Sequence, residues 1–178
     1  MGNSGERREI LERLSQRVPL KSSWHRRVAS QLRASRVDVG VHLAIFVEPY
    51  LTAVLDGKKT IESRFAVTRR PPYECVEPND YILLKRSGGP VIGVALAKSI
   101  SFYKLSPTVL ADIRRKFARQ LFALDEGFWH DRADKLYATL IELEDAVAID
   151  PFSIEKRDRQ GWVTYDRRSF REPVQLDI

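Results

Sequence analysis

The segment DGKKTIESR, residues 56–64, joins an expected helix to an expected strand. Apolar residues before it recur at helical spacing, and Gly57 stands where a helix commonly ends, because glycine reaches the left-handed backbone conformation cheaply. Over Thr60 to Ala66 apolar and polar residues alternate, which is typical of a strand with one buried face. Glu62 and Arg64 should therefore project from the same face, about 7 Å apart along the strand.

Three charged side chains of this segment are expected to act together: Lys59, Glu62 and Arg64. A carboxylate between two cations stays ionised and is oriented by them, so it can accept hydrogen bonds from the amino edge of a base, or accept a proton. A lysine in a partly desolvated site has a depressed pKa and can serve as a base or nucleophile. The alternative is an ordinary ladder of surface salt bridges, which contributes little to stability.

The pattern G-x-K-x-x-E-x-R over residues 57–64 resembles the signature of the ASCH (ASC-1 homology) domains in the PUA-like superfamily. The surrounding order agrees, because an expected strand and helix precede it (residues 43–55) and the segment LLKRSGGPVIG follows it (residues 83–93). The resemblance extends through residues 137–143 and excludes residues 1–40. It implies a small β-barrel with a cleft lined by the signature residues.

Members of that family are associated with RNA binding, RNA metabolism and coactivator roles. An amidohydrolase subgroup removes acyl groups from N4-acylated cytidine, and others are ribonucleases. The resemblance implies a catalytic role for Lys59, and for Arg64 a role as an anchor for a phosphate or carbonyl. In the enzyme hypothesis, Lys59 is the base or nucleophile activator and Glu62 carries the proton. Glu62, however, stands where the amidohydrolases have a threonine, which weakens the catalytic precedent. Binding of RNA, other single-stranded nucleic acid or a nucleotide therefore ranks above hydrolysis, and a protein-interaction module ranks third.

Beyond residue 40, expected strands outnumber expected helices and do not alternate strictly with them, which argues against a doubly wound parallel sheet. Ser106 and Pro107 should begin the longest helix, as cap and first helical residue. The sequence predicts an α+β fold: a small, mixed and mostly antiparallel β-barrel with flanking helices and an N-terminal helical extension. The expected strands cover residues 41–47, 60–66, 81–85, 91–103, 136–143, 146–149 and 160–165.

Positive charge is concentrated in residues 1–40, which we interpret as a basic helical extension of a domain covering residues 41–178. The chain carries 30 Lys and Arg against 24 Asp and Glu, and nine of these bases but only four of the acids lie in the extension. Two short amphipathic helices are expected there, which either dock on the domain through Leu14 and Trp24 or become ordered only on a partner. A basic surface of this kind favours a polyanion. Its expected contacts are Arg26, Arg27, Arg33 and Arg36.

Two further features are candidates for ligand binding. In the segment KRSGG, two cations, Lys85 and Arg86, lead into a glycine turn at Ser87, whose backbone N–H groups could bind a phosphate. The alternative is a hairpin in which the glycines only supply turn geometry. Tyr50 or Trp129 is expected to form a wall of the pocket, because stacking of a base on an aromatic ring contributes about 1–3 kcal/mol.

Several classes of protein are excluded by what the sequence lacks. No apolar run is long enough to span a bilayer, and the first residues contain no secretory signal. Cys75 is the only cysteine, so neither an internal disulfide nor a cysteine-based zinc site can form. Neither a metal nor a cofactor is expected, and the cytoplasm is the simplest compartment.

Overall fold

The computed structural model describes residues 4–155 and 159–165, and it has a six-stranded sheet at its centre. The strand order is β2-β5-β4-β3-β1-β6. The pair β1 and β3 is parallel and every other pair is antiparallel. The strands are β1 (Val41–Phe46), β2 (Ile61–Ala66), β3 (Tyr81–Arg86), β4 (Val91–Lys104), β5 (Tyr137–Phe152) and β6 (Trp162–Thr164). The helices are α1 (Ser4–Ser15), α2 (Ser23–Arg33), α3 (Tyr50–Leu55), α4 (Pro107–Phe117) and α5 (Glu126–His130). The predicted α+β class and the mixed, mostly antiparallel sheet are confirmed.

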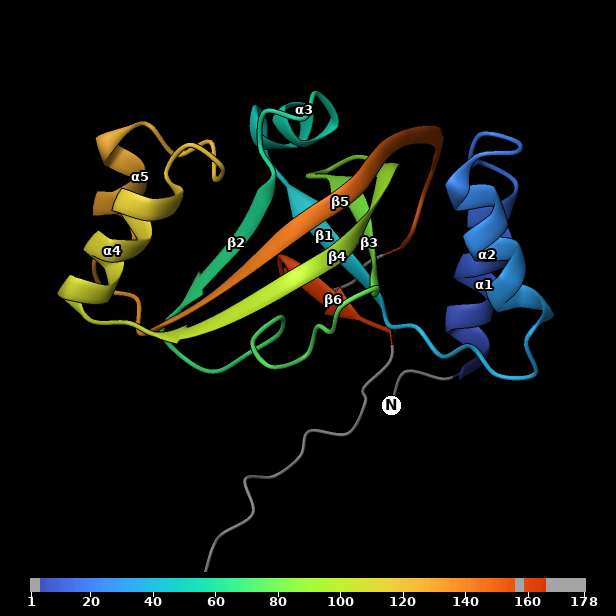
Figure 1. Cartoon of the computed structure of the whole chain (residues 1–178), viewed down its shortest axis with the longest axis horizontal. Coiled ribbons are helices and arrows are strands. Elements are labelled where there is room, and N and C mark those ends of the chain that lie inside the picture. Colours follow the sequence, from blue (N-terminus) through green and yellow to red (C-terminus); the bar gives the residue numbers. More distant parts are fainter. Residues whose placement is uncertain (1–3, 156–158, 166–178) are drawn as a thin grey trace, which may run out of the picture.

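The sheet is an open half-barrel, whereas a small barrel was expected (Figure 1). Within the described residues, β2 pairs only with β5 and β6 pairs only with β1. A side chain spans the gap between these two edges: Arg64 of β2 donates to the carbonyl oxygens of Gly161 (3.0 Å) and Ile45 (2.9 Å). A Cβ at position 161 would lie 2.9 Å from the guanidinium, so a larger residue there would displace it. We call this gap the seam.

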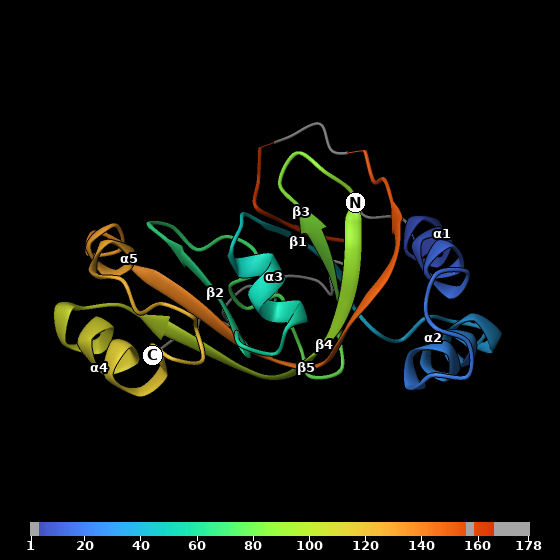
Figure 2. The ribbon, with the colours of Figure 1, turned by 90° about the horizontal axis from the view of Figure 1, so that it is seen from above.

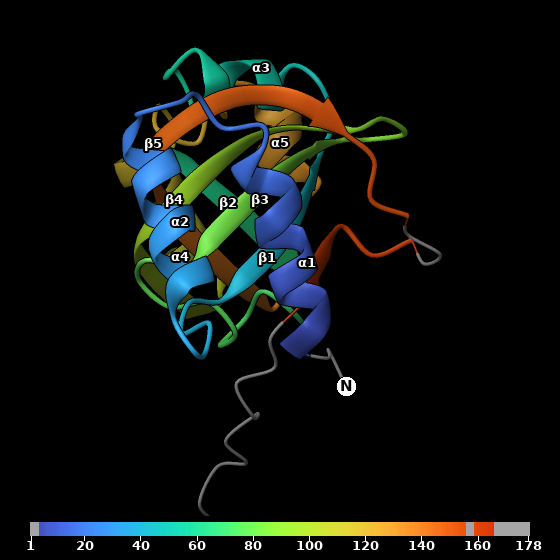
Figure 3. The ribbon, with the colours of Figure 1, turned by 90° about the vertical axis from the view of Figure 1, so that its right-hand side faces the viewer.

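Helices α1 and α2 lie side by side across one end of the sheet (Figures 1 and 3). Leu11, Leu14 and Trp24 are fully buried in a cluster that includes residues of β1, β3, β4 and β5. Ser22 caps α2 by accepting a hydrogen bond from the His25 amide, 3.1 Å away. Of the two alternatives for the N-terminal helices, docking on the sheet is the one observed.

Helices α4 and α5 cover the opposite end of the sheet, next to β2 (Figure 2). Ser106 caps α4 by accepting from the Val109 amide, and Pro107 is the first helical residue, as predicted. The prediction that this helix is the longest is wrong, because α4 has 11 residues and α1 has 12. Ile113 and Leu121 are buried there with apolar residues of β2 and β5. This packing brings α5 and the turn after it to the edge of the sheet that carries Glu62.

Strand β5 is continuous, although two strands were expected in its place. Its pairing with β4 shifts register, and Asp145, at the position where the prediction left a gap, has a positive φ of 53°. Such an irregularity bends a strand without ending it. The bend lets one strand run along both ends of the curled sheet.

Two features are absent from the part of the chain that the structure describes. None of the helices in residues 4–155 and 159–165 has the length and apolar character needed to cross a membrane. In the same ranges, no group of three or more His, Cys, Asp and Glu side chains is arranged so that it could hold a metal ion.

Candidate functional site

The exit from α3 fixes the position of Lys59. Gly57 has a φ of 72°, the left-handed conformation expected for it. The amides of Lys58 and Lys59 both donate to the carbonyl of Ala53, at 2.8 and 2.9 Å. The chain therefore enters β2 at a defined point, and the Lys59 side chain is directed into the protein, where it is 3% exposed.

The Lys59 ammonium is surrounded by acceptors. Its Nζ lies 2.7 Å from the carbonyl oxygen of Ile61, 3.0 Å from that of Leu121 and 3.3 Å from Oε2 of Glu62. Burial lowers the pKa of Lys59, and the charge of Glu62 opposes that shift. Three acceptors match the three N–H donors of an ammonium, so the group is held as a cation that ties β2 to the segment after α4.

Glu62 lies between two cations, and one of them, Arg64, is the residue that alternation along β2 predicted to share its face. Its Oε2 faces Lys59, and its Oε1 lies 2.7 Å from Nε of Arg64. The carboxylate is buried, with 4% of Glu62 exposed. An ordinary surface ladder of salt bridges does not fit this arrangement, because Lys59 and Glu62 are both removed from solvent.

The Arg64 side chain is also held in one position, by polar partners and by aromatic rings. Besides its contacts with Glu62, Ile45 and Gly161, its guanidinium carbon lies 5.5 Å from the ring centre of Phe46 and 5.4 Å from that of Trp162. An arginine between aromatic rings, with its donors directed to fixed acceptors, has little freedom to move.

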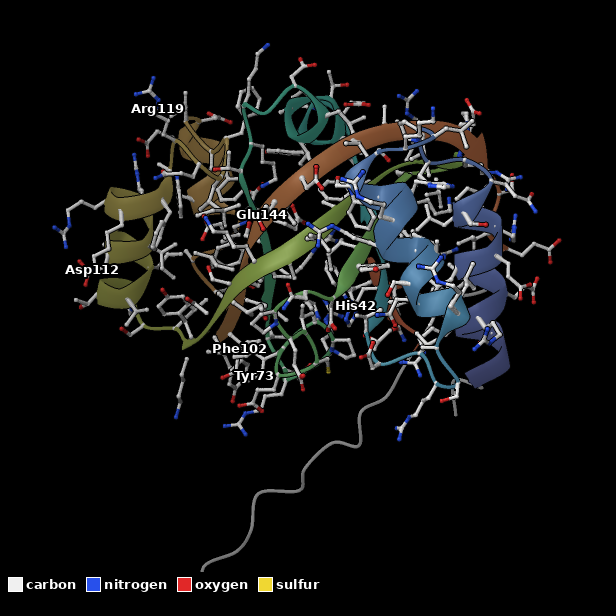
Figure 4. All side chains as sticks on the ribbon, turned by 45° about the vertical axis from the view of Figure 1, so that its right-hand side comes forward. His42, Tyr73, Phe102, Asp112, Arg119 and Glu144 are labelled. Atoms are coloured by element: carbon white, nitrogen blue, oxygen red, sulfur yellow. The ribbon has the colours of Figure 1, made fainter. Side chains whose placement is uncertain are left out.

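His42, a buried histidine of β1, contacts β6 and holds that strand next to β1. The segment before β6 is thereby placed within reach of Arg64. Trp162 donates its indole N–H to Nδ1 of His42, 3.3 Å away, so Nε2 of that ring carries the proton and faces Asp80 Oδ2 at 3.0 Å. Thr164 is also within hydrogen-bonding distance of Nδ1 (3.1 Å). His42, labelled in Figure 4, thus has the structural role expected of a histidine in an apolar strand.

A cavity of about 390 Å³ lies beside Glu62, between β1, α3, β2 and α5. We call it the first cavity. Four basic and two acidic residues line it together with several aromatic rings, and its volume is in the range of small-molecule sites. The lining residues are Ile45, Phe46, Val47, Tyr50, Lys59, Glu62, Ser63, Arg64, Phe65, Phe128, Asp131, Arg132 and Lys135.

Arg132 lines the first cavity, although no sequence pattern indicated that it belongs to this site. Its guanidinium carbon lies 3.5 Å from the ring centre of Phe128, and it donates from NH1 to the Phe128 carbonyl at 2.7 Å. Its Nε is buried without a hydrogen-bond partner among the described residues. Burial lowers the pKa of Arg132, which is the expected effect of an incompletely compensated charge. Only tertiary packing brings this arginine to β2, so no local pattern could have identified it.

The two predicted aromatic walls have different positions. Tyr50 lines the first cavity, and its ring centre lies 5.6 Å from Lys59 Nζ. Trp129 does not line it: the side chain is 5% exposed and its indole N–H donates to the Ala123 carbonyl, 2.9 Å away. Its neighbour Phe128 faces the cavity instead, because successive residues of a helix point in directions about 100° apart.

The turn between β3 and β4 is closed by its own hydrogen bonds. The Ser87 amide donates to Phe46 and the Gly89 amide donates to the Arg86 carbonyl. Lys85 donates to the carbonyls of Arg86 and Gly89, and Arg86 lies 3.4 Å from Glu48. Lys85, Arg86 and Ser87 do not line the first cavity, and the turn-geometry alternative fits them better than a phosphate site.

The basic residues of the N-terminal segment lie at the far end of the sheet from α4 and α5 (Figure 2). Arg26 donates to the Lys21 carbonyl at 2.8 Å, and Arg27 lies 3.9 Å from Asp145. Arg33 and Arg36 are exposed. None of the four lines the first cavity.

Known proteins provide a comparison for the fold. No protein-family model and no curated protein matches this sequence. The crystal structure of ASCH from Zymomonas mobilis is similar, with a TM-score of 0.52 and 23% identity, over 64% of this chain and 73% of that chain. Two point mutants of ZmASCH give TM-scores of 0.51, at 20% identity (64% of this chain and 76% of that one) and 21% identity (63% and 72%). The chain therefore has the fold of the ASCH domain.

Proposed function

We propose that the first cavity binds the base of a nucleotide, and that the protein is an RNA-binding module. The observation that carries this proposal is the Glu62 carboxylate, which is buried between Lys59 and Arg64 and borders a cavity with aromatic walls. Each carboxylate oxygen has two lone pairs. Lys59 and Arg64 each approach one oxygen, which leaves capacity to accept N–H groups from the amino edge of a base.

The rest of the cavity complements a nucleotide. Tyr50, Phe65 and Phe128 provide aromatic surface, and stacking a base on one ring contributes about 1–3 kcal/mol. Arg132 and Lys135 provide positive charge at the same cavity, where a phosphate can be held by charge-assisted hydrogen bonds. The ASCH fold is consistent with this function but does not by itself establish it.

The geometry favours binding over hydrolysis. As a base or nucleophile Lys59 would need a free lone pair, yet its nitrogen is directed at two carbonyls and a carboxylate. We therefore assign Lys59 a positioning role: its ammonium orients the Glu62 carboxylate. Incubation with N-acylated nucleosides and short RNAs, followed by mass spectrometry, should give no product. Product formed by the wild type and lost in a Lys59→Met protein that circular dichroism shows to be folded would overturn this assignment.

Glu62→Gln tests base recognition directly. Glutamine has the same shape but only one acceptor oxygen, so the variant should lose affinity for bases with an exocyclic amino group. We expect a loss of about tenfold, or ~1.4 kcal/mol, for oligo(A) and oligo(C), with little change for oligo(U). Fluorescence anisotropy with these three RNAs at low salt measures the effect, after circular dichroism has confirmed that the variant is folded.

The matched control is Glu144→Gln, which removes an exposed carboxylate on β5 (Figure 4). It should leave all three affinities unchanged. Equal losses for the three RNAs in Glu62→Gln would contradict base recognition by the carboxylate, and no RNA binding by the wild type would contradict the proposed function itself.

A further inference from the structure

A second cavity of about 310 Å³ lies in the same seam, on the other side of the Arg64 side chain. It lies between β2, the proline-rich loop after β2, β5 and the segment that leads into β6. Arg64 and Phe65 line both cavities, so the two are neighbours separated by one side chain. Its lining residues are Arg64, Phe65, Ala66, Arg70, Pro71, Pro72, Tyr73, Tyr137, Thr139, Arg159, Gln160, Gly161 and Trp162.

The second cavity differs from the first in charge. Three arginines and no acidic residue line it, whereas the first cavity contains Glu62 and Asp131. Arg70 and Arg159 are exposed, and Arg64 is tied to its carbonyl partners. A cavity with cations and no carboxylate favours an anionic group such as a phosphodiester.

The aromatic wall of the second cavity is held in place by contacts between its own rings. Tyr73 is 8% exposed, and its ring centre lies 5.3 Å from Phe102 and 5.2 Å from Tyr137. Figure 4 shows Tyr73 and Phe102 together at one end of the sheet. Arg69 adds a further cation, 5.5 Å from the ring centre of Tyr137. Rigid aromatic surface beside positive charge is the arrangement with which proteins bind single-stranded nucleic acid.

We infer that the seam binds two consecutive nucleotides of a single-stranded RNA. The first cavity takes one base, and the second cavity takes the adjoining phosphate and stacks the next base against its aromatic wall. This inference rests on the proposed function for the first nucleotide. It depends on the barrel being open, because a β2–β6 ladder would close the seam in which both cavities lie. Arg64 separates the two sites and stays bound to its carbonyl partners.

The test compares Arg70→Ala/Arg159→Ala with a control pair that removes the same charge elsewhere, Lys116→Ala/Arg119→Ala. Both control residues are exposed, on α4 and just after it. Anisotropy competition measures binding of a mononucleotide, a dinucleotide and an eight-residue single strand, the last as RNA and as DNA. We expect Arg70→Ala/Arg159→Ala to weaken dinucleotide and octamer binding about tenfold. The slope of log affinity against log salt should fall by about 0.7, because one phosphate is no longer neutralised. Mononucleotide binding should be unchanged.

Four outcomes would overturn the inference or part of it. Unchanged octamer affinity in Arg70→Ala/Arg159→Ala, or an equal loss in the control pair, would overturn the second site. An equal loss for mononucleotide and octamer would overturn the assignment of separate nucleotides to the two cavities. Equal affinity for RNA and DNA would overturn the restriction to RNA while supporting strand binding.

The two proposals can fail separately. If Glu62→Gln leaves base preference unchanged while Arg70→Ala/Arg159→Ala weakens octamer binding, the proposed function of the first cavity fails and phosphate binding in the second is supported. If the wild type binds none of the four probes, both proposals are overturned.

Discussion

The two ends of the sheet are built on different principles. At the α1 and α2 end, Leu11, Leu14 and Trp24 fill an interior that is mainly apolar. At the α4 and α5 end, an ammonium and a carboxylate, Lys59 and Glu62, are buried as a pair. Apolar burial stabilises without direction, whereas buried charges are tolerated only when each has well-placed partners. The α1 and α2 end therefore contributes mainly stability, whereas the α4 and α5 end holds a preorganised polar site.

The N-terminal helices illustrate how one segment can have two roles. Their inward faces belong to the largest buried cluster, and residues 1–40, which contain both helices, hold nine of the 30 Lys and Arg but only four of the 24 Asp and Glu. Deleting residues 1–40 would therefore expose the core as well as remove charge. Point variants separate the two contributions.

The largest effect is expected for Lys59→Met. Removing the ammonium leaves a buried carboxylate with Arg64 as its remaining ion-pair partner and leaves two carbonyls without their donor, so the free energy of unfolding should fall by about 3–5 kcal/mol. Urea denaturation followed by circular dichroism measures this change. Lys58→Met, at an exposed neighbour, should stay within about 0.5 kcal/mol of the wild type. A loss below about 1 kcal/mol in Lys59→Met would show that the pair is not buried as described.

Leu14→Ala tests the apolar end. Leu14 is fully buried, so truncation should lower the free energy of unfolding by about 2–5 kcal/mol, through lost transfer energy and a residual cavity. The folded variant should bind RNA with unchanged affinity, which anisotropy at low temperature measures. A selective loss of RNA affinity in a fully folded Leu14→Ala protein would indicate that the two ends are coupled.

Arg33→Ala/Arg36→Ala tests the basic surface. These residues line neither cavity, so their contribution should be a general attraction, worth about threefold in affinity at 50 mM salt and lost near 200 mM salt. The measurement is octamer affinity as a function of salt, with Arg70→Ala/Arg159→Ala alongside. A larger loss in Arg33→Ala/Arg36→Ala than in the seam variant would place the strand on α2.

The smallest effect concerns alkaline pH. Burial raises the pKa of Tyr81 to about 12, and this ring packs edge-on against Trp24 at the apolar end. Between its unfolded pKa of about 10 and its folded pKa, the unfolded chain loses a proton that the folded chain keeps, so stability falls as pH rises. Tyr81→Phe should match the wild type at pH 9 and lose less stability by pH 11, as measured by urea denaturation.

Lys59 has the opposite effect on the pH dependence of stability, because burial lowers its pKa in the folded protein. Below its ordinary pKa the unfolded chain binds the proton more strongly, so this group alone makes stability rise with pH. The difference between Tyr81→Phe and the wild type isolates the tyrosine. An equal alkaline loss in both proteins would assign the effect to other groups.

Features that depend on a few neighbouring residues were determined by the sequence. Gly57 ends a helix because of its own backbone freedom, Ser106 caps a helix because its hydroxyl reaches the amide three residues on, and Glu62 and Arg64 share a face because strands alternate. The signature pattern also indicated the fold. Each of these rests on short-range geometry that folding does not change.

What depends on distant parts of the chain was decided only by the tertiary structure. Lys59 is buried because Leu121, 62 residues away, supplies a carbonyl, and Arg132 reaches the first cavity because α5 packs beside β2. The same packing turns Phe128, rather than Trp129, toward the site. Among the described residues, Arg64 of β2 donates to the Gly161 carbonyl just before β6, at the gap where no strand ladder joins the two edges. Burial and long-range contact are properties of the whole packed chain, and no local pattern of residue types encodes them.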